Sequence, residues 1–336
     1  MALLAYIGRR LVFIAPQLLG IVFVSFLLIK TIPGDPAVLM LGPTATPEAI
    51  AALRQKMGLD EPVLVQFWIY LKNLMAGDLG TSWQTTRPVL EDLIQRFPAT
   101  VELVTLGLLV AVIIGVPLGL ASAFRPKGWL ARVADFYGLS AGAVPDFWLA
   151  LVLIYVFYTA LGIAPAPLGR IDLAIIPPPP VTGVYLIDSL LAGDWDAFYS
   201  AGAHLVLPVA TLGLINAGPI LKMTQSTVEK MLQADFSRFE VLCGIPHRLV
   251  VRHALRNALP SVVTIISVLY GFLLGGAVLV EIVFSWGGAG QYAVQGVLNS
   301  DLYPVLGFVL FAAIFSLFVY LVVDLIYFAI DPRISH

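Results

Sequence analysis

Six long apolar stretches, separated by shorter polar segments, follow one another along the chain. They cover about residues 11–32, 100–124, 136–161, 204–224, 259–284 and 304–330. A hydrocarbon core about 30 Å thick requires about 20 apolar residues in a helix that rises about 1.5 Å per residue. Each stretch is therefore predicted to cross a membrane. The fold class that follows is an all-α integral membrane protein with six transmembrane helices.

The first stretch is predicted to be a retained helix rather than a secretory signal. Its apolar run is longer than the about 7–15 residues usual in a signal, and no A-x-A-like cleavage site follows it. The rigid turn IPGDP at residues 32–36 comes next. Residues 1–32 are assigned to the N-terminal segment and first helix.

Lys and Arg gather on one side of the predicted membrane. Such residues are enriched in short cytoplasmic loops. Twelve of the 19 lie before the first stretch, between the second and third, from the end of the fourth to the start of the fifth, or after the sixth. The link between the fifth and sixth stretches has none. Both termini are therefore predicted to be cytoplasmic, including a tail at residues 331–336.

Two segments are predicted to lie outside. Residues 33–98 are expected to form an extracytoplasmic cap with short helices at about 47–57 and 62–75, the first capped by Thr46 and ended by Gly58. The link 162–203 contains four consecutive prolines, which favour a stiff polyproline II spacer. The core is assigned to residues 99–330.

The cytoplasmic segment at about 225–258 is polar and basic. Residues 234–243 are predicted to form one short helix, Gly244 to break it, Pro246 to redirect the chain, and a second helix to start near His247. Two short helices joined at a glycine would form a rigid projection on which a soluble protein could push. The alternative is a basic loop attracted to anionic lipid.

Two polar residues inside the predicted spans are candidates for lining a translocation path. Asp146, next to Pro145, could meet a cationic group such as the amino terminus of a peptide, because an ionisable residue in a span usually faces a cavity or a partner. Alternatively Ser140, Tyr137 or the backbone at the proline kink satisfies it. Asn216 could line the path or join helices by hydrogen bonds.

Glycines spaced four apart could allow close contact between helices. Such pairs occur at Gly115/Gly119, Gly138/Gly142 and Gly271/Gly275.

Composition and motifs exclude several classes of protein. The chain is 59% hydrophobic and only 12% charged, with a formal net charge of −2 and one cysteine. These values argue against a nucleic-acid-binding surface, a disulfide framework and a Cys-rich metal site. No P-loop, HExxH or GxSxG motif occurs. We therefore expect no catalytic residue, no metal site and no cofactor in this chain, whose surroundings would be a lipid bilayer.

The chain resembles the permease subunits of ABC importers for dipeptides and oligopeptides, specifically the first of the two permeases of such an importer. The residues that carry the resemblance are IPGDP at 32–36, MGLD at 57–60, GDLGTS at 77–82, RFPATVEL at 96–103, HALRNAL at 253–259, FSW at 284–286, DLYPV at 301–305 and VDLIYFAIDPRI at 323–334. The chain departs from the family pattern at residues 240–243 and at Gly287.

The resemblance implies a type I ABC importer permease fold in a bacterial inner membrane. It implies a second homologous permease, two ATPase subunits that bind ATP and Mg²⁺, and an extracytoplasmic substrate-binding protein. The family's coupling motif would have its glycine at Gly244. The candidate ATPase-coupling residues are Asp235, Arg238, Glu240, Gly244, His247 and Arg248.

The function expected from the sequence is import of di- or oligopeptides. Sister importers for nickel, glutathione or oligosaccharide derivatives remain an alternative. A secondary transporter driven by an ion gradient would need repeated halves with broken helices, and no such repeat is visible. A membrane scaffold would not need the projection.

Overall fold

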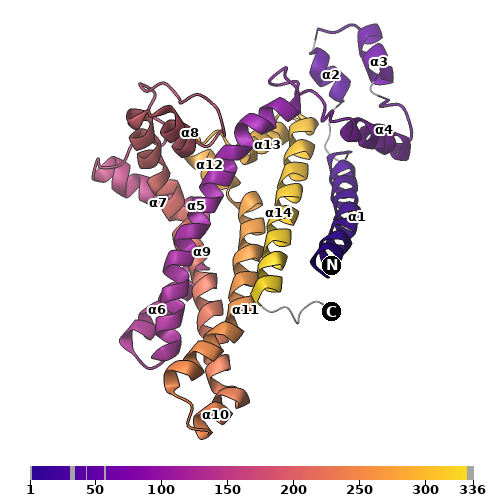
Figure 1. Ribbon diagram of the computed structural model, residues 1–336. Coiled ribbons are helices and arrows are strands. Elements are labelled where there is room, and N and C mark those ends of the chain that lie inside the picture. The colour runs from indigo at the N-terminus through magenta and orange to yellow at the C-terminus, as the bar shows by residue number, and fades with distance from the viewer. Residues whose placement is uncertain (1, 31–34, 43, 57, 331–336) are drawn as a thin grey trace. The chain divides into compact units, whose positions relative to one another are not determined.

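The computed structural model describes residues 2–30, 35–42, 44–56 and 58–330 (Figure 1). The predicted turn at 32–36 lies largely outside these residues, and the predicted tail at 331–336 lies wholly outside them. Within the described residues the chain is helical, with one isolated β-bridge between Thr81 and Pro88. The elements are α1 (Ala2–Lys30), α2 (Pro36–Leu41), α3 (Pro47–Lys56), α4 (Val63–Met75), α5 (Val89–Phe124), α6 (Trp129–Ala141), α7 (Asp146–Leu153), the π-helix η1 (Ile154–Ala160), α8 (Tyr185–Ala192), α9 (Trp195–Gln233), α10 (Asp235–Leu242), α11 (His247–Gly276), α12 (Val278–Val283), α13 (Ala289–Leu298) and α14 (Leu302–Ile330).

The chain forms two compact units. The first combines the residues up to Pro98 with Gly287–Leu317, and the second combines Ala99–Trp286 with the residues from Phe318 onward. Within the second unit, α10 lies toward one end of α9 and α8 toward the other (Figure 1). This unit therefore separates the predicted cytoplasmic projection from the predicted outer link.

Four described helices are long and apolar enough to cross a membrane: α5, α9, α11 and α14. A fifth candidate is the pair formed by α6 with α7 and η1. The described apolar part of α1 is Val12–Leu28, shorter than the about 20 residues that a span requires. The sequence thus predicted the positions of the five core segments, and a crossing by α1 stays a prediction.

The third predicted span is not the single helix expected over residues 136–161. Its two parts are bent by 107° at a break after Ala141. Gly142 disfavours helix and Pro145, at φ −66° and ψ 140°, has no backbone N–H to continue one. The sequence indicated a kink at Pro145 but not a break of this size.

The helices that contain the fourth and fifth predicted spans have limits different from those of the apolar stretches. The fourth helix, α9, has 39 residues, and the fifth, α11, has 30 and joins the helix predicted to start near His247 to the span predicted from about residue 259. α11 ends at Gly276 and the separate α12 follows, so residues 277–284 are not part of the same helix. Both long helices continue past the apolar stretch into the predicted projection.

Small residues let the helices of the second unit approach closely. A Cβ added to Gly115 would lie 2.7 Å from the carbonyl oxygen of Ala217 and 2.9 Å from Ile220 Cβ. Gly119 faces Leu221 and Thr224 of α9 in the same way. In contrast, a Cβ on Gly275 would meet nothing within 4 Å. The glycine pair in α5 is therefore required by packing against α9.

The first unit is held together by aromatic and buried polar contacts. Phe26 of α1 lies 5.5 Å from Phe67 and 5.8 Å from Tyr70, measured between ring centroids.

The two short helices predicted in the cap are confirmed as α3 and α4. At the start of α3, Thr46 Oγ1 accepts a hydrogen bond from the N–H of Ala49, and Gly58 after its end has φ +66°.

Gly115→Ala is expected to destabilise the second unit by about 1–3 kcal/mol, because the added methyl group would collide with the backbone of α9. The measurement is unfolding of the purified protein in detergent, with Gly275→Ala as the matched control. Equal stability of the two variants would contradict the close α5–α9 contact.

Candidate functional site

The predicted break at Gly244 is present and has the hydrogen bonds of a Schellman motif. The N–H of Gly244 donates to Val241 O at 3.0 Å, and the N–H of Ile245 donates to Glu240 O at 3.0 Å. Gly244 has φ +74°, a conformation that favours glycine. Pro246 then precedes α11. The break at Gly244 and the helix start near His247 are therefore confirmed, but the second helix is the 30-residue α11 rather than a short helix.

Two side-chain contacts fix α10 against its neighbours. Ser237 Oγ donates to Met231 O at 2.7 Å, which joins α10 to the end of α9. Glu240 Oε1 lies 2.8 Å from His253 Nδ1, which joins α10 to α11. α9, α10 and α11 therefore form a connected and rigid projection.

The surface of this projection is more apolar than its sequence suggested. Of the predicted coupling residues, Asp235, Arg238, Gly244, His247 and Arg248 are exposed, and Glu240 is half-buried. Leu242 is 85% exposed and Phe239 66% exposed. A polar and basic composition did not predict these apolar side chains. The sequence of α10 did indicate that some apolar side chains would be exposed, because it has more apolar residues than one buried face of a two-turn helix can hold.

The two candidate path residues lie in different surroundings. Asp146 is the first residue of α7, directly after the bend, and is half-buried. Within the described part of the chain its carboxylate has no hydrogen-bond or ion-pair partner. Tyr137, proposed as an alternative partner, instead donates to Leu214 O. The positive end of the α7 dipole favours a carboxylate at this position.

Asn216 is buried in α9, where its Nδ2 donates to Leu212 O at 2.8 Å in the same helix. This contact satisfies one of its groups locally and does not join two helices. Its assignment to the path stays a prediction.

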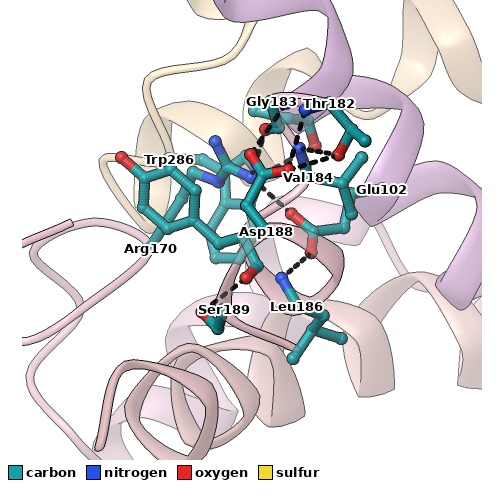
Figure 2. Close-up of polar contacts among 11 residues, drawn as sticks. Glu102, Arg170, Thr182, Gly183, Val184, Leu186, Asp188, Ser189 and Trp286 are labelled. Carbon is teal, nitrogen blue, oxygen red and sulfur yellow. Dashed lines mark hydrogen bonds and ion pairs between the residues drawn. The ribbon is translucent and has the colours of Figure 1, made fainter. Parts of the chain in front are cut away.

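A buried ion pair that the sequence did not reveal lies at the α8 end of the second unit (Figure 2). Arg170 Nη2 lies 2.6 Å from Glu102 Oε2, and the two side chains are 9% and 2% exposed. The same nitrogen donates to Gly183 O at 3.0 Å. The guanidinium carbon is 3.7 Å from the ring centroid of Tyr185. The pair thus joins the outer link to α5.

Asp188 orders the turn that precedes α8 (Figure 2). Its Oδ1 accepts from Thr182 N and Thr182 Oγ1, both at 2.7 Å, and its Oδ2 accepts from Gly183 N at 2.9 Å. Burial acts to raise the pKa of Asp188, but these hydrogen bonds outweigh it and hold the pKa below its usual value. The link is therefore fixed from two sides, by Asp188 and by Arg170.

The Glu102–Arg170 pair could not be read from local sequence. Glu102 and Arg170 are 68 positions apart, and no periodic pattern relates them. The described residues contain no group of three His, Cys, Asp or Glu side chains placed to hold a metal ion.

Glu102→Gln is expected to destabilise the protein by about 3–5 kcal/mol, because it leaves the buried Arg170 charge without its counter-ion. Asp135→Asn is the matched control. Asp135 lies 2.5 Å from Lys222 in a pair whose side chains are 42% and 35% exposed, so its loss should cost no more than about 1 kcal/mol. Detergent-solubilised protein unfolded by denaturant measures both, and similar costs would refute the role given to the buried pair.

Comparison with known proteins covers almost the whole chain. The family described as binding-protein-dependent transport system inner membrane component matches residues 115–336, and the N-terminal family of the same systems matches residues 3–104. A dipeptide transport system permease protein of Alkalihalophilus pseudofirmus is 40% identical over 99% of this chain and 100% of its own length.

Two further relatives also match nearly the full length of this chain. A probable D,D-dipeptide transport system permease protein of Escherichia coli is 41% identical over 94% of this chain and 93% of its own length. A glutathione transport system permease protein of Salmonella choleraesuis is 34% identical over 99% and 100%. The chain therefore belongs to the family of binding-protein-dependent transport system inner membrane components, and it is a membrane permease subunit with the type I ABC importer fold rather than an enzyme.

Proposed function

We propose that this chain forms one half of a translocation path for short peptides, dipeptides foremost, in an ATP-driven importer. The observation that carries this proposal is the similarity over almost the whole chain to relatives named for dipeptide and D,D-dipeptide transport, at 40% and 41% identity. The relative named for glutathione transport, itself a peptide derivative, is 34% identical. Peptides therefore rank ahead of nickel and oligosaccharide derivatives as cargo.

The projection formed by α10 is proposed as the contact for the ATPase subunits, which would bind ATP and Mg²⁺. Its rigidity supports this role, since a flexible loop would absorb movement instead of transmitting it. The exposed Leu242 and Phe239 also support it, because apolar side chains can fill pockets at the centre of an interface. Asp235, Arg238, His247 and Arg248 then supply the charged contacts around them.

The complete importer would contain a second homologous permease, two ATPase subunits and an extracytoplasmic binding protein, in a bacterial inner membrane. Both termini and the α10 projection would face the cytoplasm. The distribution of Lys and Arg supports this orientation, since 12 of the 19 lie in the segments predicted to face the cytoplasm. Residues 33–98 and the link fixed by Arg170 would then face the binding protein.

Gly244→Val is expected to uncouple ATP hydrolysis from uptake of radiolabelled L-Ala-L-Ala while the protein stays in the membrane. No atom lies within 4 Å of an added Cβ, so the effect would come from the backbone at φ +74°, which a β-branched residue disfavours. Gly244→Asn is the matched control, because asparagine tolerates this conformation.

Full, ATP-dependent uptake by the valine variant would contradict the role of the turn. The same assay tests the cargo. L-Ala-L-Ala uptake that persists undiminished in cells lacking the chain would argue against peptide import by this protein.

Asp146 is proposed to meet the ammonium group of the cargo, since its carboxylate lies at a helix break and has no partner in the described part of the chain. Asp146→Asn should lower uptake of L-Ala-L-Ala by about tenfold, but should change uptake of N-acetyl-L-Ala-L-Ala little. Asn216→Ala is measured alongside. An equal effect of Asp146→Asn on both peptides would indicate that Asp146 has only a structural role. Unchanged uptake in Asn216→Ala would indicate that Asn216 does not line the path.

A further inference from the structure

The first unit contains a cavity of about 450 Å³ between the cap helices, the end of α1 and the start of α14. This volume lies within the range of about 300–1,000 Å³ typical of small-molecule sites. The cavity is distinct from Asp146 and from α10, which belong to the second unit.

Two cations line the cavity. Lys30 is the last residue of α1 and Lys56 the last residue of α3. The ammonium of Lys30 donates to Gln66 Oε1 of α4, and the aromatic packing of Phe26 on α4 fixes this end of α1. Both cations are exposed, so a ligand can reach them without unfolding the wall.

Two carboxylates, Asp78 and Asp301, also line the cavity, and both accept hydrogen bonds. Asp78 Oδ1 accepts from Gly80 N at 2.8 Å. Gly80 lies against Tyr303, whose ring would be 2.5 Å from an added Cβ. Asp301 Oδ2 accepts from Ser82 Oγ at 2.6 Å and from Gln84 N at 3.2 Å.

Asp301 is buried, and this burial raises its pKa even though the hydrogen bonds from Ser82 and the Gln84 backbone act in the opposite direction. A cationic group placed in the cavity would offset the cost of burying this charge. The carboxylates of the wall therefore favour binding of an ammonium group, and its lysines favour binding of an anion.

We propose that this cavity binds a short peptide in its zwitterionic form, with the ammonium group near Asp78 and Asp301 and the carboxylate near Lys30 and Lys56. A simple anion would bring no positive charge to the two carboxylates, and a simple cation would bring no negative charge to the two lysines. The identification of the ligand as a peptide rests on the proposed function. The site would hold cargo in the cap, apart from the path at Asp146.

Binding is measured on the full chain with its partner permease, purified without the binding protein, in nanodiscs of phosphatidylcholine and phosphatidylglycerol. The probe is radiolabelled L-Ala-L-Ala. We expect saturable binding that Asp78→Asn weakens about tenfold or more, while N-acetyl-L-Ala-L-Ala binds both proteins equally. Lys56→Gln should weaken L-Ala-L-Ala but not its C-terminal amide.

Matched controls are Asp60→Asn and Lys72→Gln, which alter exposed charges of the cap outside the cavity wall. Both should bind L-Ala-L-Ala like the unaltered protein. Absence of saturable binding, or binding that the cavity variants and the controls affect alike, would overturn the proposal.

Phosphatidylethanolamine has the same combination of an ammonium and an anionic group, so a second set of nanodiscs contains it. Its displacement of L-Ala-L-Ala would assign the cavity to a lipid headgroup and overturn the peptide proposal. The two proposals fail separately. Peptide import that needs the chain, without binding by the purified permeases, refutes only the cavity. Binding without any chain-dependent import refutes only the proposed function.

Discussion

A bilayer offers no hydrogen-bond partners to a chain that crosses it, so backbone groups and charges must be satisfied within the protein. The described residues meet this constraint with long helices, and a well-buried ion pair, Glu102–Arg170, joins the outer link to α5 at 2.6 Å. That pair fixes the outer link to α5, and Asp188 orders the turn beside it. The α8 end of the second unit is therefore rigid, and the glycines of α5 allow α9 to pack closely along it.

Rigidity also explains how the α10 end could work. α9 and α11 continue past their apolar stretches as 39- and 30-residue helices into the projection. The Schellman turn at Gly244 and the Glu240–His253 contact join them through α10. A push on α10 would therefore move two membrane helices as levers. The exposed apolar side chains of α10 would provide the surface that a partner protein contacts.

Much of this fold could be predicted from the sequence because it follows local rules. Apolar runs of sufficient length located the helices, and Gly244 followed by Pro246 located the turn between α10 and α11. The 107° bend before Asp146 could not be predicted in size, since Pro145 indicates a kink but neighbouring helices set its angle. The partners of Arg170 and the exposure of Leu242 depend on contacts between distant segments, and no local pattern contains that information.

We propose that ATPase subunits drive this permease by moving α10. The most direct measurement is L-Ala-L-Ala uptake into proteoliposomes that contain the chain, its partner permease and the binding protein, with and without the ATPase subunits and ATP. We expect uptake only when the ATPases and ATP are both present. Uptake by the permeases alone, driven by an ion gradient, would contradict it.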